Sequence, residues 1–357
     1  MTVYILNFLT LPIYNLLIKD RKKLVLIFTA QLFLILALRD PTVGMDLPNY
    51  SGGYAYISSL RLGELLSRLR LISTAKLVSP YAYESGYVVL NWLLSKIGIG
   101  FQGFLILHAA FCMSSFGLFI YRYSKLPWIS FSMLLALSYF EYSFGILRQM
   151  LAICILLYAV PMIERKKPIP FFLLVLLAFT VHRVALIFAV LYLAYYITVT
   201  RWVYIGNAIF WVVLTALSPL IFNVLIVRIL QALGKNSYTV SKFEWSHLMT
   251  ILLIFAVGAF FTLDFSTMKE RRNSIITWGF LLAFPIQILG MNNAVFARMV
   301  LVYLVFAIIF VPNVIAEYKK KPILAQIGAY VLWLFMFILM VLQLRSSAIV
   351  PYSTFFS

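Results

Sequence analysis

The chain has 357 residues, of which 64% are hydrophobic and 11% are charged. Soluble domains are about 45–50% apolar and about 25% charged, so this composition excludes a water-soluble fold. The formal net charge is +18. In a membrane protein the position of each basic residue is more informative than this sum, because lysine and arginine concentrate in cytoplasmic loops.

Continuous apolar runs predict membrane-spanning helices along the whole chain. A helix needs about 20 residues to cross the bilayer. The predicted crossings are residues 3–18, 24–38, 101–121, 127–143, 145–163, 169–181, 184–199, 202–222, 247–263, 274–290, 294–312 and 323–343. Residues 87–97 form a shorter apolar run, which we expect to be re-entrant or interfacial. The expected fold is an all-α polytopic membrane protein with about 12 transmembrane helices, in a range of about 11–14.

The basic clusters set the predicted topology. If both ends lie outside and residues 87–97 do not cross, the tight basic clusters fall on the cytoplasmic side. These clusters are residues 19–23, 122–125, 165–167, 269–272 and 319–321. The two halves of the predicted hairpin at 169–199 are both short for a crossing, so a single bent helix is the alternative there.

Two long loops, at about residues 39–86 and 223–246, are then extra-cytoplasmic. The first contains the amphipathic stretch Leu60–Val78, which is typical of a helix lying on the membrane surface. Nothing in the sequence marks a second domain. We therefore expect one integral-membrane domain over residues 1–357.

Five arginines lie at or just inside the outer ends of predicted crossings. They are Arg39, Arg148, Arg183, Arg298 and Arg345. Ionisable groups within a span are expensive and usually face a cavity or a partner. Acidic residues on the outer side are too few to neutralise them. Arginine at all five positions favours bidentate binding of phosphate or carboxylate, and a diphosphate at the membrane surface fits. For each arginine alone, snorkelling or an ion pair is the alternative.

One histidine, His182, stands beside Arg183 in an otherwise apolar stretch. A neighbouring cation favours the neutral imidazole, which a general base requires. We take His182 as the first candidate base, with Asp46 and Glu84 as alternatives. A packed or hydrogen-bonded histidine is the competing interpretation. The chain has no Asp-x-Asp pair, and its two cysteines lie in apolar stretches, so we predict no metal site.

Several short motifs together resemble a known family. They are Arg39–Asp46 followed by Asn49-Tyr50, Tyr83–Tyr87, Leu147–Gln149, the segment opening at His182, and Val350–Tyr352. Their order along residues 39–352 is similar to that of the EpsG-like, Wzy-type polysaccharide polymerases.

The resemblance implies a bacterial inner-membrane glycosyltransferase with its active site on the extra-cytoplasmic side. Such an enzyme joins oligosaccharide repeat units, carried on undecaprenyl diphosphate, into O-antigen, capsule or exopolysaccharide. Donor and acceptor would both be lipid-linked, with no cofactor and no nucleic acid. Membrane lipids and a chain-length regulator are the other expected partners.

The positions of the charged residues and the family resemblance together assign roles to ten residues. The expected catalytic residues are His182, Arg148, Asp46 and Glu84, and the residues expected to bind the diphosphate or glycan are Arg39, Arg183, Arg298, Arg345, Tyr87 and Tyr352. A flippase of lipid-linked oligosaccharide is the main alternative function, although such transporters are built from two related halves, which this sequence does not show. An O-antigen ligase or another lipid-linked glycan transferase is the second alternative.

Overall fold

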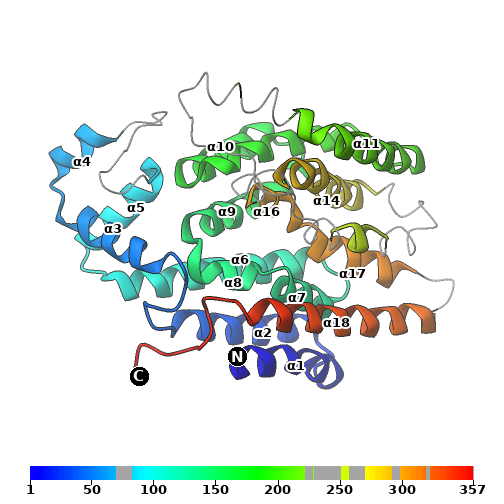
Figure 1. The fold of residues 1–357 in the computed structure, drawn as a ribbon, viewed down its shortest axis with the longest axis horizontal. Helices are drawn as coiled ribbons and strands as arrows, with labels where there is room; N and C mark the ends of the chain where they lie inside the picture. Colours follow the sequence, from blue (N-terminus) through cyan, green and yellow to red (C-terminus); the bar gives the residue numbers. More distant parts are fainter. Residues whose placement is uncertain are drawn as a thin grey trace. The chain divides into compact units, whose positions relative to one another are not determined.

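The computed structural model describes residues 1–69, 83–221, 228, 251–256, 270–291, 298–318 and 322–356. The described residues form helices and no strand (Figure 1). In chain order the helices are α1 (Thr2–Leu17), α2 (Arg21–Ala37), α3 (Leu47–Ser59), α4 (Leu62–Arg68), α5 (Ser85–Lys96), α6 (Phe101–Tyr123), α7 (Pro127–Ala136), α8 (Tyr139–Gly145), α9 (Leu147–Glu164), α10 (Pro168–Val181), the 3₁₀ helix η1 (Arg183–Tyr195), α11 (Arg201–Leu220), α14 (Arg271–Gly290), α16 (Leu301–Leu304), α17 (Ala307–Glu317) and α18 (Pro322–Leu344).

Five of these helices, α6, α9, α11, α14 and α18, are long and apolar enough to cross a membrane. Five shorter apolar segments accompany them: Thr2–Leu17, Pro127–Ala136, Pro168–Val181, Arg183–Tyr195 and Leu301–Glu317. The prediction of an all-helical protein with several membrane-spanning helices is confirmed. The number of about 12 crossings and their orientation remain predictions.

Helix α5 corresponds to the short apolar run at 87–97. It has 12 residues, about 18 Å at 1.5 Å per residue, against a hydrocarbon core about 30 Å thick. This length suits the re-entrant or interfacial position expected for it. In the amphipathic stretch 60–78, the structure describes only α4 and the residues beside it, and residues 70–82 lie outside the described part. Most of the predicted crossing 247–263 and most of the loop 223–246 also lie outside it.

The apolar run 127–143 does not form one helix. It divides into α7 and α8 at Ser138, whose φ of 61° lies in the left-handed region that L-residues rarely adopt. The Ser138 hydroxyl is 3.1 Å from the Oε1 atom of Gln343. The run 184–199 also differs, because its first part is the 3₁₀ helix η1. Hydropathy reports burial and does not distinguish an α-helix from a 3₁₀ helix or a broken helix.

The chain divides into two compact units, which we describe separately. The first comprises Met1–Met162, Lys167–Ala189 and Ile327–Ser357, and the second comprises Ile163–Lys166 and Val190–Gln326. The expectation of a single integral-membrane domain remains a prediction.

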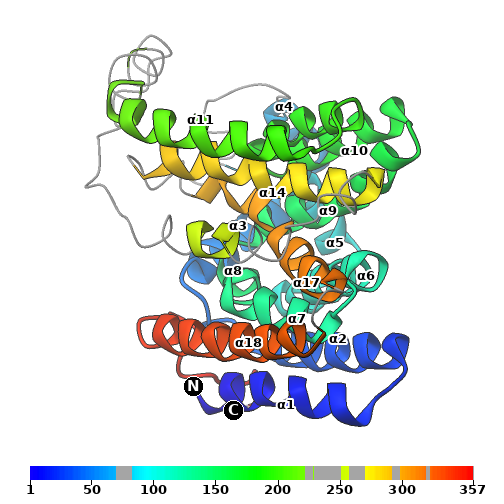
Figure 2. The ribbon, with the colours of Figure 1, turned by 90° about the vertical axis from the view of Figure 1, so that its right-hand side faces the viewer.

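In the first unit α1 and α2 form an antiparallel pair, with α18 beside them in both views (Figures 1 and 2). The ring of Phe8 on α1 lies 5.5 Å from that of Phe337 on α18. Helix α2 packs closely on α6 because Gly117 leaves room for Thr29; a Cβ at Gly117 would lie 2.4 Å from the Thr29 hydroxyl.

In the second unit α14 is the central helix. Phe284 of α14 stacks on Trp211 of α11 with ring centroids 3.7 Å apart. Phe280 of α14 stacks on Phe310 of α17 at 4.9 Å. Aromatic stacking thus holds this unit together.

Candidate functional site

The centre of the candidate site is an ion pair between Glu84 and Arg148. Glu84 is the residue before α5, and Arg148 lies in the first turn of α9. The Arg148 Nη1 atom donates to Oε2 of Glu84. The two side chains are only 21% and 13% exposed, so solvent screens this pair less than a surface pair. The pair joins two segments 64 residues apart in the sequence.

Two tyrosines, Tyr50 and Tyr83, hold the Arg148 guanidinium from the side. Its Cζ atom lies 4.8 Å from the centre of the Tyr83 ring and 6.0 Å from that of Tyr50. The two rings stack on each other at 5.7 Å, and the Tyr83 hydroxyl donates to the Asn49 carbonyl at 2.8 Å. Cation–π contact and the ion pair therefore fix the orientation of the planar guanidinium.

The His182-Arg183 segment lies on the same carboxylate. Helix α10 ends at Val181, and His182 is extended. The next backbone N–H, that of Arg183, donates to Oε1 of Glu84 at 3.4 Å. One carboxylate thus contacts both the Arg148 side chain and the Arg183 backbone.

A glycine makes this contact possible. A Cβ at Gly86 would lie 2.2 Å from the Thr180 hydroxyl and 2.9 Å from the Thr180 carbonyl oxygen. Only glycine therefore lets the start of α5 approach the end of α10 so closely. Glu84 reaches Arg183 as a result.

His182 has a defined hydrogen bond at one ring nitrogen. The backbone N–H of Val184 donates to its Nδ1 atom at 3.3 Å. In the neutral ring this contact places the proton on Nε2, so Nδ1 is the nitrogen with a lone pair. This hydrogen bond is long for its type.

Asp46 and Tyr87 lie at the start of α3 and in α5, the two helices that carry Tyr50 and follow Glu84. Asp46 precedes α3, is partly exposed, and makes no capping hydrogen bond with its side chain. Tyr87 is 1% exposed and packs edge-on against Tyr83 at 5.3 Å. In this structure Tyr87 supports the tyrosines that hold Arg148.

The other predicted binding residues differ in their surroundings. Arg39 is fully buried against the ring of Phe144. Tyr352 donates its hydroxyl to the Ile35 carbonyl at 2.9 Å. Arg345 is exposed just after α18, and Arg298 is exposed in the second unit.

Among the described residues, the structure therefore gives only two of the five arginines, Arg148 and Arg183, a contact with the same group. Our sequence reasoning gave no role to Tyr50 and Tyr83. The available signal was their place in the motifs Asn49-Tyr50 and Tyr83–Tyr87, which carry the family resemblance.

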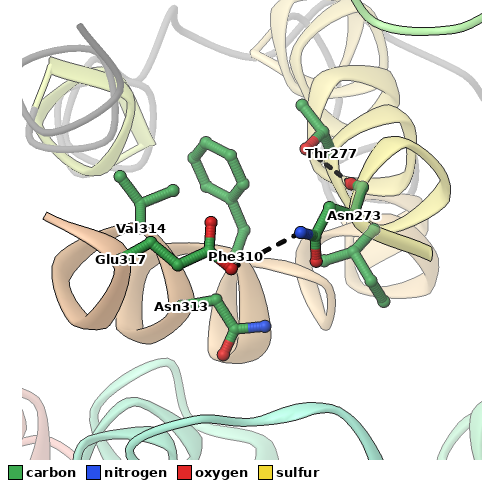
Figure 3. Close-up of a pocket in the computed structure, with 7 residues that line it drawn as sticks. Asn273, Thr277, Phe310, Asn313, Val314 and Glu317 are labelled. Carbon is green, nitrogen blue, oxygen red and sulfur yellow. Dashed lines mark hydrogen bonds between the residues drawn. The ribbon is translucent and has the colours of Figure 1, made fainter. Parts of the chain in front are cut away.

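A separate hollow occurs in the second unit between α14 and α17 (Figure 3). It is lined by Asn273, Ile276, Thr277, Phe310, Asn313, Val314 and Glu317. Asn273 points toward Glu317 and donates to its Oε1 atom at 3.4 Å. None of the predicted site residues lines this hollow, so it adds nothing to the candidate site.

The five long apolar helices define a polytopic membrane protein. The partly buried ion pair of Glu84 and Arg148 gives it a polar site. The chain belongs to the EpsG family, whose family model matches residues 22–354. This confirms the family resemblance to EpsG-like polysaccharide polymerases and indicates a polymerase-type role in polysaccharide biosynthesis. No curated protein and no solved structure matches the chain.

Proposed function

We propose that the protein polymerises oligosaccharide repeat units carried on undecaprenyl diphosphate into a surface polysaccharide. The reaction takes place on the outer face of the bacterial inner membrane. The observation that carries this proposal is the Arg148 guanidinium, held by Glu84 and two tyrosines at the end of a membrane-spanning helix. A fixed guanidinium at this depth suits a diphosphate joined to a lipid.

Arg148 stabilises the departing diphosphate in this proposal. The bond between the sugar anomeric carbon and the lipid diphosphate oxygen breaks, and negative charge builds on the diphosphate. A preorganised cation can stabilise this charge in a site of low polarity without a metal ion. Arg183, whose backbone N–H donates to Glu84, adds a second cation in this proposal.

The second substrate supplies the attacking hydroxyl. This hydroxyl belongs to the non-reducing-end sugar of a lipid-linked acceptor, and its oxygen forms the new bond to the anomeric carbon. We assign its proton to Nδ1 of His182, where the hydroxyl takes the place of the Val184 N–H. Glu84 is less suited to be the base because both of its oxygens already accept hydrogen bonds. Asp46, whose carboxylate makes no capping bond, is the alternative.

The remaining assignments extend this proposal. The diphosphate or the glycan is contacted during chain extension by Arg298, Arg345 and Tyr352. A chain-length regulator and the surrounding lipids are the other partners, and no cofactor takes part.

The proposal can be tested with the purified protein in detergent. Detergent micelles have no two sides, so a flippase cannot be detected there, whereas a polymerase still elongates. We expect a defined undecaprenyl-diphosphate-linked repeat unit to give a ladder of products on a gel, with no other protein added. A single unextended band would contradict the proposal.

A further inference from the structure

Arg39 is fully buried and incompletely bonded. Its side chain is 0% exposed. Its Nη1 atom donates to the Leu36 carbonyl, but Nε and Nη2 have no hydrogen-bond partner among the described residues. Leaving buried donors unpaired is costly, and native structures rarely do so.

The described residues around Arg39 do not supply a carboxylate. The structure describes no carboxylate in contact with its guanidinium. The ring of Phe144 lies 5.1 Å from Cζ, and a cation–π contact offsets only part of the cost of burying a charge. The unpaired atoms, Nε and Nη2, form one edge of the guanidinium. This edge matches two oxygens of a phosphate in a bidentate contact.

A short segment pairs with the backbone on both sides of Arg39. We call residues Ser346–Phe356, which follow α18, the strap. Its backbone pairs with the end of α2 through two bonds, from Asp40 N to Ser353 O at 2.9 Å and from Phe355 N to Leu38 O at 3.1 Å. Arg39 lies opposite Thr354 in the resulting bridge.

The strap is attached by a small set of hydrogen bonds and one ring contact. Besides the two backbone bonds, the Tyr352 hydroxyl donates to the Ile35 carbonyl, the Tyr4 hydroxyl donates to the Ile349 carbonyl, and the Ser347 hydroxyl donates to Oε1 of Glu141. The Tyr352 ring also packs edge-on against that of Tyr4 at 6.0 Å. The strap contains no helix, and most of its side chains are at least partly exposed. Segments with few buried contacts open at lower cost than the core.

We propose that Arg39 is a second anion site, which the strap closes in this structure and which a phosphate group occupies when the strap lifts. The phosphate comes either from a lipid diphosphate or from free inorganic diphosphate. The choice of a lipid-linked ligand rests on the proposed function, whereas the covering of Arg39 by the strap does not. A ligand that binds only the open form shifts the population toward it.

Hydrogen exchange measures the opening directly. The protein in lipid nanodiscs is mixed with undecaprenyl diphosphate, with inorganic diphosphate, or with undecaprenol as the uncharged control. We expect exchange of the Asp40 and Phe355 amides to accelerate by at least about tenfold at a ligand concentration ten times the dissociation constant for the whole protein, because about nine-tenths of the molecules then hold the ligand with the strap open. If only undecaprenyl diphosphate accelerates exchange, the ligand of Arg39 is a lipid headgroup. If undecaprenyl diphosphate and inorganic diphosphate both accelerate it, the diphosphate group is sufficient. Unchanged or slower exchange with both would overturn the proposal, as would equal acceleration by undecaprenol.

Two variants connect the opening to the strap and to Arg39. Asp40 and Ser353 are opposed in an antiparallel pair, where Cα atoms are about 5.5 Å apart, a distance that a disulfide spans. In Asp40→Cys/Ser353→Cys, oxidation to the disulfide should abolish the acceleration of amide exchange by diphosphate, and reduction should restore it. In each single variant, oxidation and reduction should leave the acceleration unchanged. Arg39→Lys should also lose the acceleration, because lysine lacks the two-nitrogen edge. Persistence of the acceleration in the oxidised pair would contradict the strap.

The outcome is separable from that of the proposed function. A product ladder without strap opening overturns the second anion site alone. Strap opening by diphosphate without a ladder overturns the polymerase proposal alone.

Discussion

Arg148 owes its proposed role to the number of groups that fix it. Glu84 takes one edge of the guanidinium, and the face lies against the tyrosine rings. A positive charge alone would not require this geometry, since a lysine also neutralises a phosphate. The planar fork is therefore what the site preserves.

We expect Arg148→Lys to weaken binding of undecaprenyl diphosphate by about tenfold, the loss of about one charge-assisted hydrogen bond. Binding can be measured with a labelled lipid and purified protein. The matched control is Arg122→Lys, at an exposed arginine near the end of α6, and it should bind as the unsubstituted protein does. Equal binding by both variants would reduce Arg148 to a source of charge.

A substitution at His182 separates its structural contact from its chemistry. In His182→Asn the amide oxygen occupies nearly the position of Nδ1 and can still accept the Val184 N–H, but it cannot take up a proton. We expect the thermal stability to be retained and the rate of chain extension to fall by about 10²–10⁴-fold, the usual value of general-base assistance. Normal extension by this variant would leave His182 with a structural role only and make Asp46 the next candidate.

At the scale of elements, glycines determine how closely the helices that carry the site approach. We expect Gly86→Ala to separate α5 from α10, because its Cβ would lie 2.2 Å from the Thr180 hydroxyl. The Glu84 contact with Arg183 should then be lost, and both the melting temperature and the rate of extension should fall.

Gly63→Ala is the control for this substitution. Gly63 is the second residue of α4, as Gly86 is of α5, but a Cβ there would have nothing within 4 Å. Alanine at this position should leave activity unchanged and stability equal or slightly higher. A similar loss of activity and stability in Gly86→Ala and Gly63→Ala would show that the close approach of α5 to α10 is not the cause.

Arg21 joins two helices at the predicted cytoplasmic side. It is the first residue of α2. Its Nη2 atom donates to two carbonyls at the end of α6, those of Tyr121 and Ser124. We expect Arg21→Ala to lower the free energy of unfolding by about 1 kcal/mol, since these carbonyls have no partner within their own helix. Thermal denaturation in detergent provides the measurement. Lys22→Ala, at the exposed neighbouring residue, should change the free energy of unfolding far less.

The sequence predicted the helices whose ends coincide with loops and missed those that tertiary contacts break. The run at 101–121 became α6 almost without change. The run at 127–143 did not, because Ser138 turns left-handed beside Gln343, which is 205 residues away. Hydropathy within a local window carries no information on such a distant contact.

The same limit applies to the candidate site. Charge and motif singled out Glu84, Arg148 and Arg183, but only the fold shows that one carboxylate joins the other two. Arg39 is a second example. Its place at a helix end singled it out, but only the structure shows that it is buried and that its backbone pairs with the strap, a segment more than 300 residues later in the sequence.

For the whole molecule, the predicted topology sets the face on which the site lies. Met45→Cys places a thiol at a residue that is 71% exposed, within the first long loop. We expect it to react with an impermeant thiol reagent in intact spheroplasts, whereas Arg165→Cys, in a predicted cytoplasmic cluster, should react only after lysis. Labelling of the Arg165 variant from outside would reverse the orientation of the crossings around it.

In the proposed reaction the Glu84–Arg148 pair acts as one unit in chain extension. Its most direct test is the initial rate of product-ladder formation by four purified proteins: the unsubstituted protein, Glu84→Gln, Arg148→Lys and the double variant. We predict that each single substitution lowers the rate at least about tenfold and that the double variant is no slower than the slower single one, because residues acting as a unit are not additive. Ladders from both single variants at the unsubstituted rate, or fully additive losses in the double variant, would contradict the account.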